Sequence, residues 1–579
     1  MQNLLLLPNI SGMKIVLKTL SAFGACMLLT VSAWTFCHWG RVPLEQVVAN
    51  LPSISNAGRW ILQNFLLFAL VPAAAAAMLF ARAGAKITAM LWLAAIIAAG
   101  INFEIPAYLQ QRHVVGTLYE REYIRPPAAS ALPNRPRNIV LLYLESFEQN
   151  YLSDPVLAPN LLRLSEQNLS FAGFHQLYGT NYTMSALVAS LCGVTYYPQY
   201  GDAVNIKHFL PQLPCIPSFL AASGYYTELI KGASLKFSGA DVFAREHGFV
   251  GMAGYEEISA NAKYRQNGNS WGLSDRGILA YTRDKISELA AKKQPFFVAA
   301  VTLDMHEPDI FVDPACPVIY HDERDAVVCV DSQIGDFVDW MQAQPFYADT
   351  LLVIAGDHIK PGNLAEERQI LNIFINSAAD FAIKPHRWTT LDMAPTVLAA
   401  AGFPVADWGL GRSLSSTEPT LYDRFGGRLD VEVRKRSDFY QRFYSRPTLQ
   451  NTPKTLVSQN EYSGKDIVGF SEDYQDRFGT IYLRQLAFRL PHTDGEKLQI
   501  AAQTMLLNKK SSKTIYITLN GKSIAPWQIS ASEAESFVRE IALPAGAADF
   551  VIEFSDVPPD SFAPQVLPLG VQKLRFSGI

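Results

Sequence analysis

Hydrophobic residues are concentrated in the first part of the chain, where three long apolar runs are separated by short polar segments. The runs are approximately Ile15–Trp34, Ile61–Phe80 and Ile87–Phe103, and the third is the shortest. A bilayer core about 30 Å thick requires roughly 20 apolar residues in a helix, so each run is long enough to cross it. A cleaved signal peptide would also explain the first run, but two further runs favour an anchor that is retained. We therefore predict a membrane anchor of three transmembrane helices over residues 1–106.

Basic residues near these runs predict the orientation of the anchor. Lys14 and Lys18 precede the first run, and Arg82 and Lys86 lie between the second and the third. By the positive-inside rule, both groups belong on the cytoplasmic side. Three crossings from that start place everything after about residue 106 outside the cytoplasm. We expect a protein of the bacterial inner (plasma) membrane whose larger part faces the periplasm or the outside.

Beyond the anchor, residues 107–136 are predicted to form a juxtamembrane helix and a proline-rich linker. Over residues 137–415, short apolar runs of the buried type alternate with helical patterns. This alternation predicts an α/β domain with helices on both faces of a mostly parallel sheet. The predicted strands are Asn138–Leu144, Tyr225–Ile230, Pro295–Leu303, Thr350–Ala355 and Leu371–Asn376, and the predicted helices include Ala158–Gln167, Ile216–Ser223 and Cys329–Gln342.

The pattern changes again after residue 415. A charged connector is predicted over residues 416–455, and short alternating strands with turn signals such as Asn520-Gly521 fill residues 456–579. This predicts a C-terminal all-β sandwich as an accessory domain. Glycan binding and a structural role as lid or spacer are both open for it. The predicted strands are Gly479–Leu490, Leu498–Leu507, Thr514–Asn520, Phe537–Leu543, Asp549–Phe554 and Val571–Phe576.

Charge and cysteine content narrow the function classes. The formal net charge is −4 and no long basic run occurs, so we expect no nucleic-acid partner. The exported part holds an even number of cysteines, which in an oxidising compartment suggests disulfides. We expect the pairs Cys316–Cys329 and Cys192–Cys215, with free buried thiols as the alternative.

Polar side chains follow three of the predicted strands at the point where each strand ends. Glu145 follows the first strand, Asp304 and His306 follow Pro295–Leu303, and Asp357 and His358 close the strand that begins at Thr350. The carboxyl ends of parallel strands meet at one edge of a sheet, where ligands bind. Glu, Asp and His around an open position suit a divalent metal. Singly, each carboxylate could be a helix cap or an ion-pair partner, but together they predict a metal site.

The stretch Gly179–Ser190 contributes a candidate nucleophile. Met184, Leu187 and Val188 are apolar at helical spacing, so Thr183 is predicted at or just before the first helical turn. Backbone N–H groups and the helix dipole favour an anion there. A hydroxyl so placed can attack phosphorus or sulfur if its pKa is lowered, which a nearby metal would do. A plain threonine N-cap is the alternative.

Several segments carry a resemblance to a known group of enzymes. The span from Asn138 to Leu414 resembles the extracytoplasmic domain of lipoteichoic acid synthases and of the phosphoglycerol transferase I family, members of the alkaline phosphatase/sulfatase superfamily. The matching segments are NIVLLYLES, GTNYTMSALVASLCG, VTLDMHEPDIF and IAGDH, and the anchor segment FCHWGRVPLEQVVANL is similar to the first external loop of these transferases. The resemblance implies Glu145, Asp357 and His358 as metal ligands, Thr183 as nucleophile and metal ligand, and His306 as the active-site histidine.

The resemblance also implies a reaction. We expect a metal-dependent, membrane-anchored transferase that moves phosphoglycerol from phosphatidylglycerol, a phospholipid donor, to an extracytoplasmic glycan acceptor. The group would pass through a covalent intermediate on Thr183. The implied metal is Mn²⁺ or Zn²⁺, with Mg²⁺ as a further candidate.

Two segments are expected to contact the substrate. Lys231 stands where lipoteichoic acid synthases have a histidine, and Ser238 and Ala240 stand where they have a tryptophan and an arginine. These departures put the identity of the transferred group in question. Trp271 lies in a loop that resembles one near the substrate in the family, and a plain helix N-terminus is the alternative there.

The sequence can be compared with three other functions. A phosphoethanolamine transferase of the same superfamily would share the metal, Thr183 and the anchor. A catalytically inactive sensor or scaffold would have lost metal ligands, whereas Glu145, Asp357 and His358 are present. A sulfatase needs a Cys/Ser-x-Pro-x-Arg motif, and neither Pro nor Arg follows Thr183.

Overall fold

The structure is a computed structural model of the whole chain. It describes residues 10–50, 59–80, 84–127, 133, 135–171, 173–197, 206–265, 268–292, 294–307, 309–360, 368–378 and 386–444, and the strands between 467 and 578. Two compact units are present: residues 1–209 with 213–438, and residues 210–212 with 439–579. The domain boundaries given above stay predictions.

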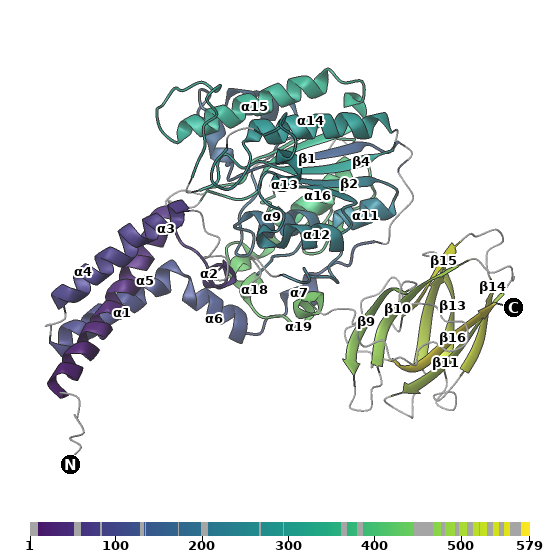
Figure 1. Cartoon of the computed structure of the whole chain (residues 1–579). Coiled ribbons are helices and arrows are strands. Elements are labelled where there is room, and N and C mark those ends of the chain that lie inside the picture. The colour runs from purple at the N-terminus through teal and green to yellow at the C-terminus, as the bar shows by residue number, and fades with distance from the viewer. Residues whose placement is uncertain are drawn as a thin grey trace, which may run out of the picture. The chain divides into compact units, whose positions relative to one another are not determined.

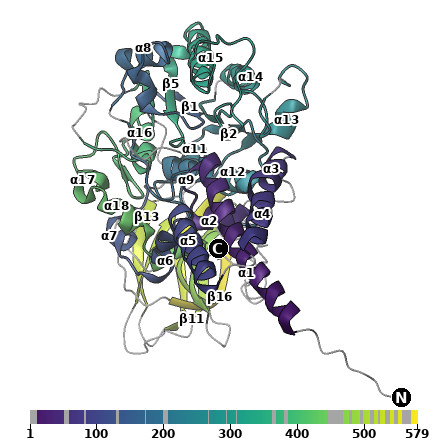
Figure 2. The ribbon, with the colours of Figure 1, turned by 90° about the vertical axis from the view of Figure 1, so that its left-hand side faces the viewer.

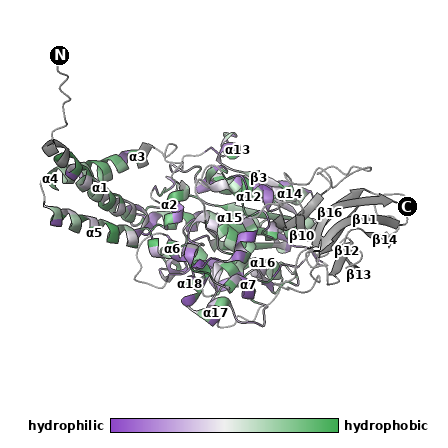
Figure 3. Ribbon diagram, turned by 90° about the horizontal axis from the view of Figure 1, so that it is seen from below, coloured by the Kyte–Doolittle hydropathy of each residue, from purple (hydrophilic) through white to green (hydrophobic). Residues whose placement is uncertain are grey.

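The anchor contains three helical spans that are long and apolar enough to cross a membrane. They are α1 (Ile10–Trp39), the continuous run α3 (Arg59–Phe65), η2 (Leu66–Leu70) and α4 (Val71–Phe80), and α5 (Ala85–Asn102). Their described residues are largely green, that is hydrophobic, in Figure 3. Large apolar side chains such as Leu79 and Met78 are 81% and 71% exposed, as expected for side chains that face lipid. The three predicted segments are therefore helical and qualify as candidate membrane spans.

The segment after the anchor differs from the prediction of a single juxtamembrane helix. Two short helices are present instead, α6 (Ile105–His113) and α7 (Leu118–Glu122). The chain is extended between them, where Val115 pairs with Arg436 in an isolated β-bridge. At Gly116 any added Cβ would lie 2.6 Å from the Lys435 side chain, so the close approach of a second segment breaks the helix.

The larger unit is built on a six-stranded sheet of order β3-β2-β4-β1-β5-β6. The first five strands run parallel, and β6 is antiparallel to β5. The predicted α/β fold with a mostly parallel sheet is confirmed, and β6 is the one antiparallel strand among the described strands of this sheet. An edge strand buried on both faces has the same continuous apolar sequence in either direction. The strands are β1 (Asn138–Leu144), β2 (Tyr226–Lys231), β3 (Gly251–Ala253), β4 (Phe296–Val301), β5 (Thr350–Gly356) and β6 (Asn372–Ile375).

Helices cover both faces of this sheet (Figures 1 and 2). One layer consists of α8 (Pro159–Gln167), α14 (Asp275–Ala291) and α15 (Arg324–Gln342). The other consists of α9 (Thr183–Cys192), α11 (Ile216–Ala222), α12 (Ala240–Glu246) and α16 (Met393–Ala400). Alternate residues of β1 (Val140, Leu142 and Leu144) are fully buried in the core cluster that the first layer completes.

The smaller unit contains only β-strands beyond residue 466 among the residues that the structure describes. All its strand pairs are antiparallel, as a β-sandwich requires, and its division into two layers stays a prediction. Two of the strands, β9 and β13, were not predicted. The strands are β9 (Ile467–Gln475), β10 (Ile481–Pro491), β11 (Lys497–Leu506), β12 (Lys513–Leu519), β13 (Lys522–Ile529), β14 (Phe537–Ala542), β15 (Asp549–Ser555) and β16 (Leu569–Gly578).

Candidate active site

Two neighbouring strand ends bring three of the predicted ligands together. Glu145 follows β1 directly, and Asp357 and His358 follow β5. One potential ligand atom from each lies within 4.8 Å of the others. His358 Nε2 is 3.2 Å from Glu145 Oε1 and 3.5 Å from Asp357 Oδ2. All three side chains are buried, so their charges are poorly screened.

The hydrogen bonds around this cluster leave metal-ligating atoms free. Asp357 Oδ1 accepts hydrogen bonds from the backbone N–H groups of Ser146 (2.8 Å) and His358 (2.7 Å). Asp357 Oδ2 is buried and has no hydrogen-bond partner among the described residues. His358 Nδ1 lies 3.1 Å from the Ile359 carbonyl oxygen, which can only accept, so Nδ1 carries a proton and Nε2 is the nitrogen that a metal would bind after displacing its proton. A buried carboxylate oxygen without a partner is costly unless a cation completes it. The residues present therefore fit a divalent metal.

The shifted pKa values of the cluster also fit a divalent metal. Burial, followed by the charge of Glu145, raises the pKa of Asp357 to about 7. Burial lowers the pKa of His358, but the carboxylates of Asp357 and Glu145 outweigh it and raise that pKa to about 10. Two carboxylates that compete for one proton, beside an imidazole drawn to its charged form, indicate a site with excess negative charge.

Thr183 is the first residue of α9, as the sequence predicted. Its hydroxyl donates a hydrogen bond of 3.2 Å to Glu145 Oε2. Behind it, the helix is anchored by Met184 and Leu187, which are 1% and 0% exposed. The candidate nucleophile and the candidate metal ligands therefore share one carboxylate.

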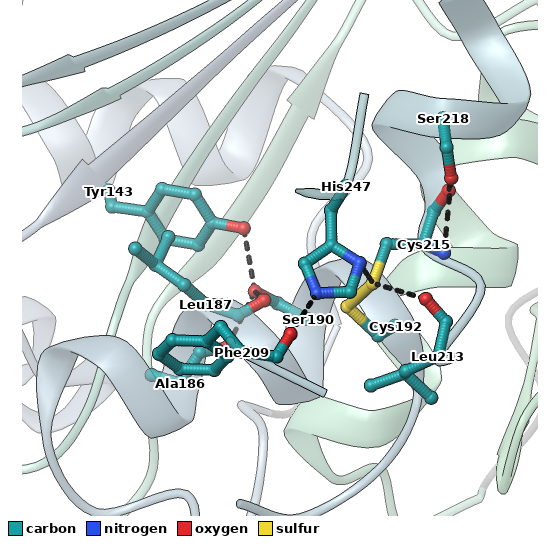
Figure 4. Close-up of a disulfide and its surroundings, with 10 residues drawn as sticks. All are labelled: Tyr143, Ala186, Leu187, Ser190, Cys192, Phe209, Leu213, Cys215, Ser218 and His247. Atoms are coloured by element: carbon teal, nitrogen blue, oxygen red, sulfur yellow. Dashed lines mark hydrogen bonds between the residues drawn. A yellow bond between two sulfur atoms is a disulfide. The ribbon is translucent and has the colours of Figure 1, made fainter. Parts of the chain in front are cut away.

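The other end of α9 is fixed by the Cys192–Cys215 disulfide (Figure 4). Nearby, the hydroxyls of Ser190 and Tyr143 lie 2.6 Å apart, which ties α9 to β1. The ring of His247 packs beside the disulfide, with Nε2 2.7 Å from the carbonyl oxygen of Phe209. The Cys316–Cys329 disulfide is also present, so both predicted pairs are confirmed.

A second wall of the site is aromatic and basic. The rings of His306 and Trp271 have centroids 4.3 Å apart, and Trp271 lies 5.9 Å from Phe237. Lys231 Nζ lies 5.7 Å from the centroid of Phe237. His306 Nδ1 is 2.7 Å from the Glu307 carbonyl oxygen and therefore donates to it, which leaves Nε2 as the free ring nitrogen.

The ionisation of this wall is set by burial. Burial lowers the pKa of Lys231 to about 8, although Glu145 and Asp357 favour its charged form. Burial also lowers the pKa of His306, so its ring is neutral at neutral pH. The wall therefore presents a proton acceptor and a cation that can give up its charge.

Several residues near the site were not found from the sequence. Lys360 Nζ bonds Glu307 (2.9 Å) and Glu323 (2.7 Å), and so ties the loop after β5 to the loop after β4. Arg368 pairs with the buried Glu148 and also donates to the Lys360 carbonyl oxygen. These links join residues far apart in sequence, and only the clustering of charge near each strand end hinted at them.

Asp304 was predicted at a strand end together with the metal ligands, but it is not part of their cluster. It is 1% exposed and lies beside Asp275, the first residue of α14. Asp275 Oδ1 accepts the backbone N–H groups of Leu303 (2.5 Å) and Asp304 (3.1 Å). The two carboxylates therefore form a separate buried pair that holds the end of β4 against α14.

The family described as Sulfatase matches residues 137–403. This range contains the whole of the sheet β1–β6 and every residue of the candidate site. This part of the chain is therefore similar to the sulfatase family, in line with the resemblance of its motifs.

Two curated relatives are both named phosphoglycerol transferase I. Phosphoglycerol transferase I of Citrobacter koseri is 30% identical over 410 residues, which are 66% of this chain and 52% of that protein. Phosphoglycerol transferase I of Escherichia coli O127:H6 is 33% identical over 352 residues, 55% of this chain and 45% of that protein. The chain thus spans about half the length of the curated relatives it matches.

Solved structures are more distant. The lipoteichoic acid synthase LtaP from Listeria monocytogenes is 18% identical, with a TM-score of 0.40 over 53% of this chain and 81% of that one. A protein of the alkaline phosphatase superfamily from Vibrio parahaemolyticus is 20% identical, with a TM-score of 0.43 over 54% of this chain and 78% of that one. The likeness of residues 137–403 to the sulfatase family therefore rests on sequence alone.

Proposed function

We propose that this sulfatase-like domain transfers phosphoglycerol from phosphatidylglycerol to a glycan outside the cytoplasm. The observation that carries the proposal is the convergence of Thr183, Glu145, Asp357 and His358 at one point. The name shared by the curated relatives supports phosphoglycerol as the transferred group.

The donor set supports a resident divalent metal. Glu145, Asp357 and His358 would hold it, with Thr183 as the fourth ligand. When bound, such a metal lowers the pKa of the Thr183 hydroxyl and neutralises charge on the phosphoryl group. Carboxylate, imidazole and hydroxyl ligands suit Mn²⁺ or Zn²⁺, and Mg²⁺ is a further candidate.

In the first half-reaction, Thr183 Oγ1 forms a bond to the phosphorus of phosphatidylglycerol, and the bond from phosphorus to the diacylglycerol oxygen breaks. The proton lost by Thr183, whose hydroxyl bonds Glu145 Oε2, is relayed from that carboxylate to His306 Nε2, the free ring nitrogen, which passes it to the departing oxygen. Diacylglycerol leaves, and phosphoglycerol stays on Thr183 as a phosphodiester.

In the second half-reaction, a sugar hydroxyl attacks the same phosphorus, and Thr183 leaves with the proton that His306 took from the sugar. Splitting the transfer in two suits substrates that differ greatly in polarity, because they need not be bound together. Charged Lys231 binds the phosphoryl oxygens. The indole N–H of Trp271 is buried without a partner among the described residues, and we assign it a substrate hydroxyl.

The anchor suits a lipid donor. Three candidate spans hold the domain at a membrane, where the donor headgroup lies. We propose that the domain faces the periplasm, because the basic residues before and between the spans favour the cytoplasmic side.

Mass spectrometry of the Thr183 peptide tests the proposal. The full chain is incubated with phosphatidylglycerol vesicles without acceptor, and a phosphoglycerol adduct on Thr183 is expected. Thr183→Ala should abolish both adduct and transfer, whereas Thr180→Ser, whose hydroxyl bonds Leu177 and not the site, should retain them. A phosphoethanolamine adduct from mixed vesicles would favour the alternative donor. Transfer that persists in Thr183→Ala would refute the covalent route.

A further inference from the structure

Tyr178 lies just before the turn that leads to Thr183, and three contacts hold it. Its hydroxyl donates a hydrogen bond to Glu45. Its backbone N–H donates to Asp430 Oδ1 at 2.6 Å. The Arg434 guanidinium stacks on its ring at 4.1 Å from the centroid and pairs with Asp430. Asp430 and Arg434 belong to α18 (Arg428–Arg434), so one side of Tyr178 is fixed by a helix of the larger unit that lies in the predicted connector.

Glu45, on the other side, belongs to the anchor. It lies on α2 (Leu44–Asn50), which follows the first span. The N–H of Val42 donates to the Asn102 carbonyl oxygen at 3.0 Å, and Asn102 Nδ2 donates to Thr35 Oγ1 at 2.6 Å. The segment that carries Glu45 is therefore tied to the ends of both α1 and α5.

The backbone between Tyr178 and Thr183 is held in one conformation by close packing and hydrogen bonds. Gly179 has a φ of +80°, and a Cβ added there would lie 2.7 Å from the Tyr197 ring. The N–H and hydroxyl of Thr180 both bond the Leu177 carbonyl oxygen, at 3.1 and 3.0 Å. A displacement of Tyr178 must therefore be transmitted along the turn to the start of α9.

Burying the Glu45 carboxylate has a free-energy cost that a purely structural contact would not require. It is 6% exposed, and its Oε2 has no hydrogen-bond partner in the described part of the chain. Burial, above all, raises its pKa, with Glu104 adding to the shift and Arg434 opposing it. Apolar packing would stabilise the junction at less cost, so a buried carboxylate aimed at one hydroxyl indicates a requirement for a defined position.

We propose that Glu45 is a positioning residue through which the membrane anchor holds the nucleophile turn in place beside the metal ligands. The inference rests on the proposed function only in taking Thr183 as the reacting residue. It predicts that transfer depends on a hydrogen bond between the anchor and the domain, remote from any substrate.

Steady-state kinetics of the full chain in lipid nanodiscs tests the link. Glu45→Ala and Tyr178→Phe should each lower kcat by about ten- to hundredfold, because a displacement of about 1 Å from the productive geometry has that effect. KM for the donor should stay within about twofold, since no substrate contact is removed. Glu45→Gln, which keeps an acceptor oxygen, should restore most of the rate, and the double variant should be no slower than the single ones.

The matched control is Arg424→Gln. Arg424 forms an ion pair with Glu122 of α7, which also joins the segment after the anchor to a later part of the chain but does not touch Tyr178, and its loss should leave kcat unchanged. Single variants that keep the wild-type kcat, or a double variant whose losses multiply, would overturn the proposal.

Hydrogen exchange separates this inference from the proposed reaction. Backbone amides of residues 177–183 should exchange faster in Glu45→Ala than in wild type, and Glu45→Gln should match wild type. Unchanged exchange in Glu45→Ala would overturn the positioning role even where phosphoglycerol transfer is observed. A wild-type chain without that transfer would refute the reaction, while the exchange result still decides the link.

Discussion

Asp304→Asn is expected to stabilise the domain, and increasingly so as the pH rises. Neither carboxyl oxygen of Asp304 has a hydrogen-bond partner among the described residues, and Asp275 Oδ2 also lacks one. Burial, followed by the charge of Asp275, raises the pKa of Asp304 to about 9. The carboxyl group is therefore protonated in the folded domain at neutral pH and ionised in the unfolded chain.

The size of the effect follows from the two pKa values. An unfolded aspartate has a pKa of about 3.9, and each pH unit between the two values favours unfolding by about 1.4 kcal/mol. At pH 7 this is about 4 kcal/mol for an isolated group, and sharing of one proton with Asp275 reduces it to about 2 kcal/mol. Because the pKa of Asp304 is higher in the folded domain than in the unfolded chain, low pH favours the folded state. The contribution of Asp304 to stability is therefore complete below about pH 4 and is lost as the pH rises towards about 9.

Thermal unfolding of the full chain in detergent, followed from about pH 5 to pH 9, measures this. An amide cannot ionise, so the Asp304→Asn midpoint should lie about 2–4 °C above wild type at pH 7 and approach it at the acid end. Asp275→Ala is the contrasting variant and should be destabilising, because it removes the oxygen that accepts two backbone hydrogen bonds. If Asp304→Asn instead lowered the midpoint equally at every pH, Asp304 would be ionised and the reasoning refuted.

Three further outcomes are expected. Chelation with EDTA should abolish the Thr183 adduct and lower the unfolding midpoint, and Mn²⁺ or Zn²⁺ should restore both; an enzyme indifferent to EDTA would remove the metal from the proposal. Lys360→Met should lower kcat with little change in metal affinity measured by calorimetry, because Lys360 ties the His306 loop and touches no ligand atom; a loss of metal binding would contradict this. Replacing Cys192 and Cys215 by serine should cost about 3 kcal/mol of unfolding free energy, from the loop closed across a sequence separation of 23, and urea unfolding that shows no loss would contradict it.

The sheet and the ligands at its edge could be predicted because each has a local signature. Strands β1, β4 and β5 are continuous apolar runs, since both of their faces are covered by helices. The residues after each run are polar, and parallel strands bring such residues to one edge. Nothing in a run such as Leu371–Asn376 specifies direction, so the sequence did not identify β6 as the antiparallel strand of a mostly parallel sheet.

Tertiary pairings were not predictable for a related reason. The Asp275–Asp304 pair, the Lys360 clamp and the Glu45–Tyr178 bond each join segments whose proximity follows only from the assembled fold. In the juxtamembrane segment a local signal was present, because Gly116 marks the break between α6 and α7.

The site divides into a part fixed by strand pairing and a part fixed by loops. Leu144 of β1 pairs with Gly356 of β5, so the next residues, Glu145 and Asp357, emerge side by side from hydrogen-bonded strands. Gly356 is required there, because an added Cβ would lie 2.0 Å from the Phe147 carbonyl oxygen.

Thr183 and His306, in contrast, are placed by a helix start and a loop that other segments hold. Changes in those supporting segments should therefore lower kcat far more than metal affinity, because Glu145, Asp357 and His358 stay in place, whereas Gly356→Ala should weaken metal binding first. Calorimetric titration of Mn²⁺ into Gly356→Ala and Glu45→Ala measures the difference. Equal losses of metal affinity in the two variants would show that strand pairing and loop support are not separate, and would refute the division.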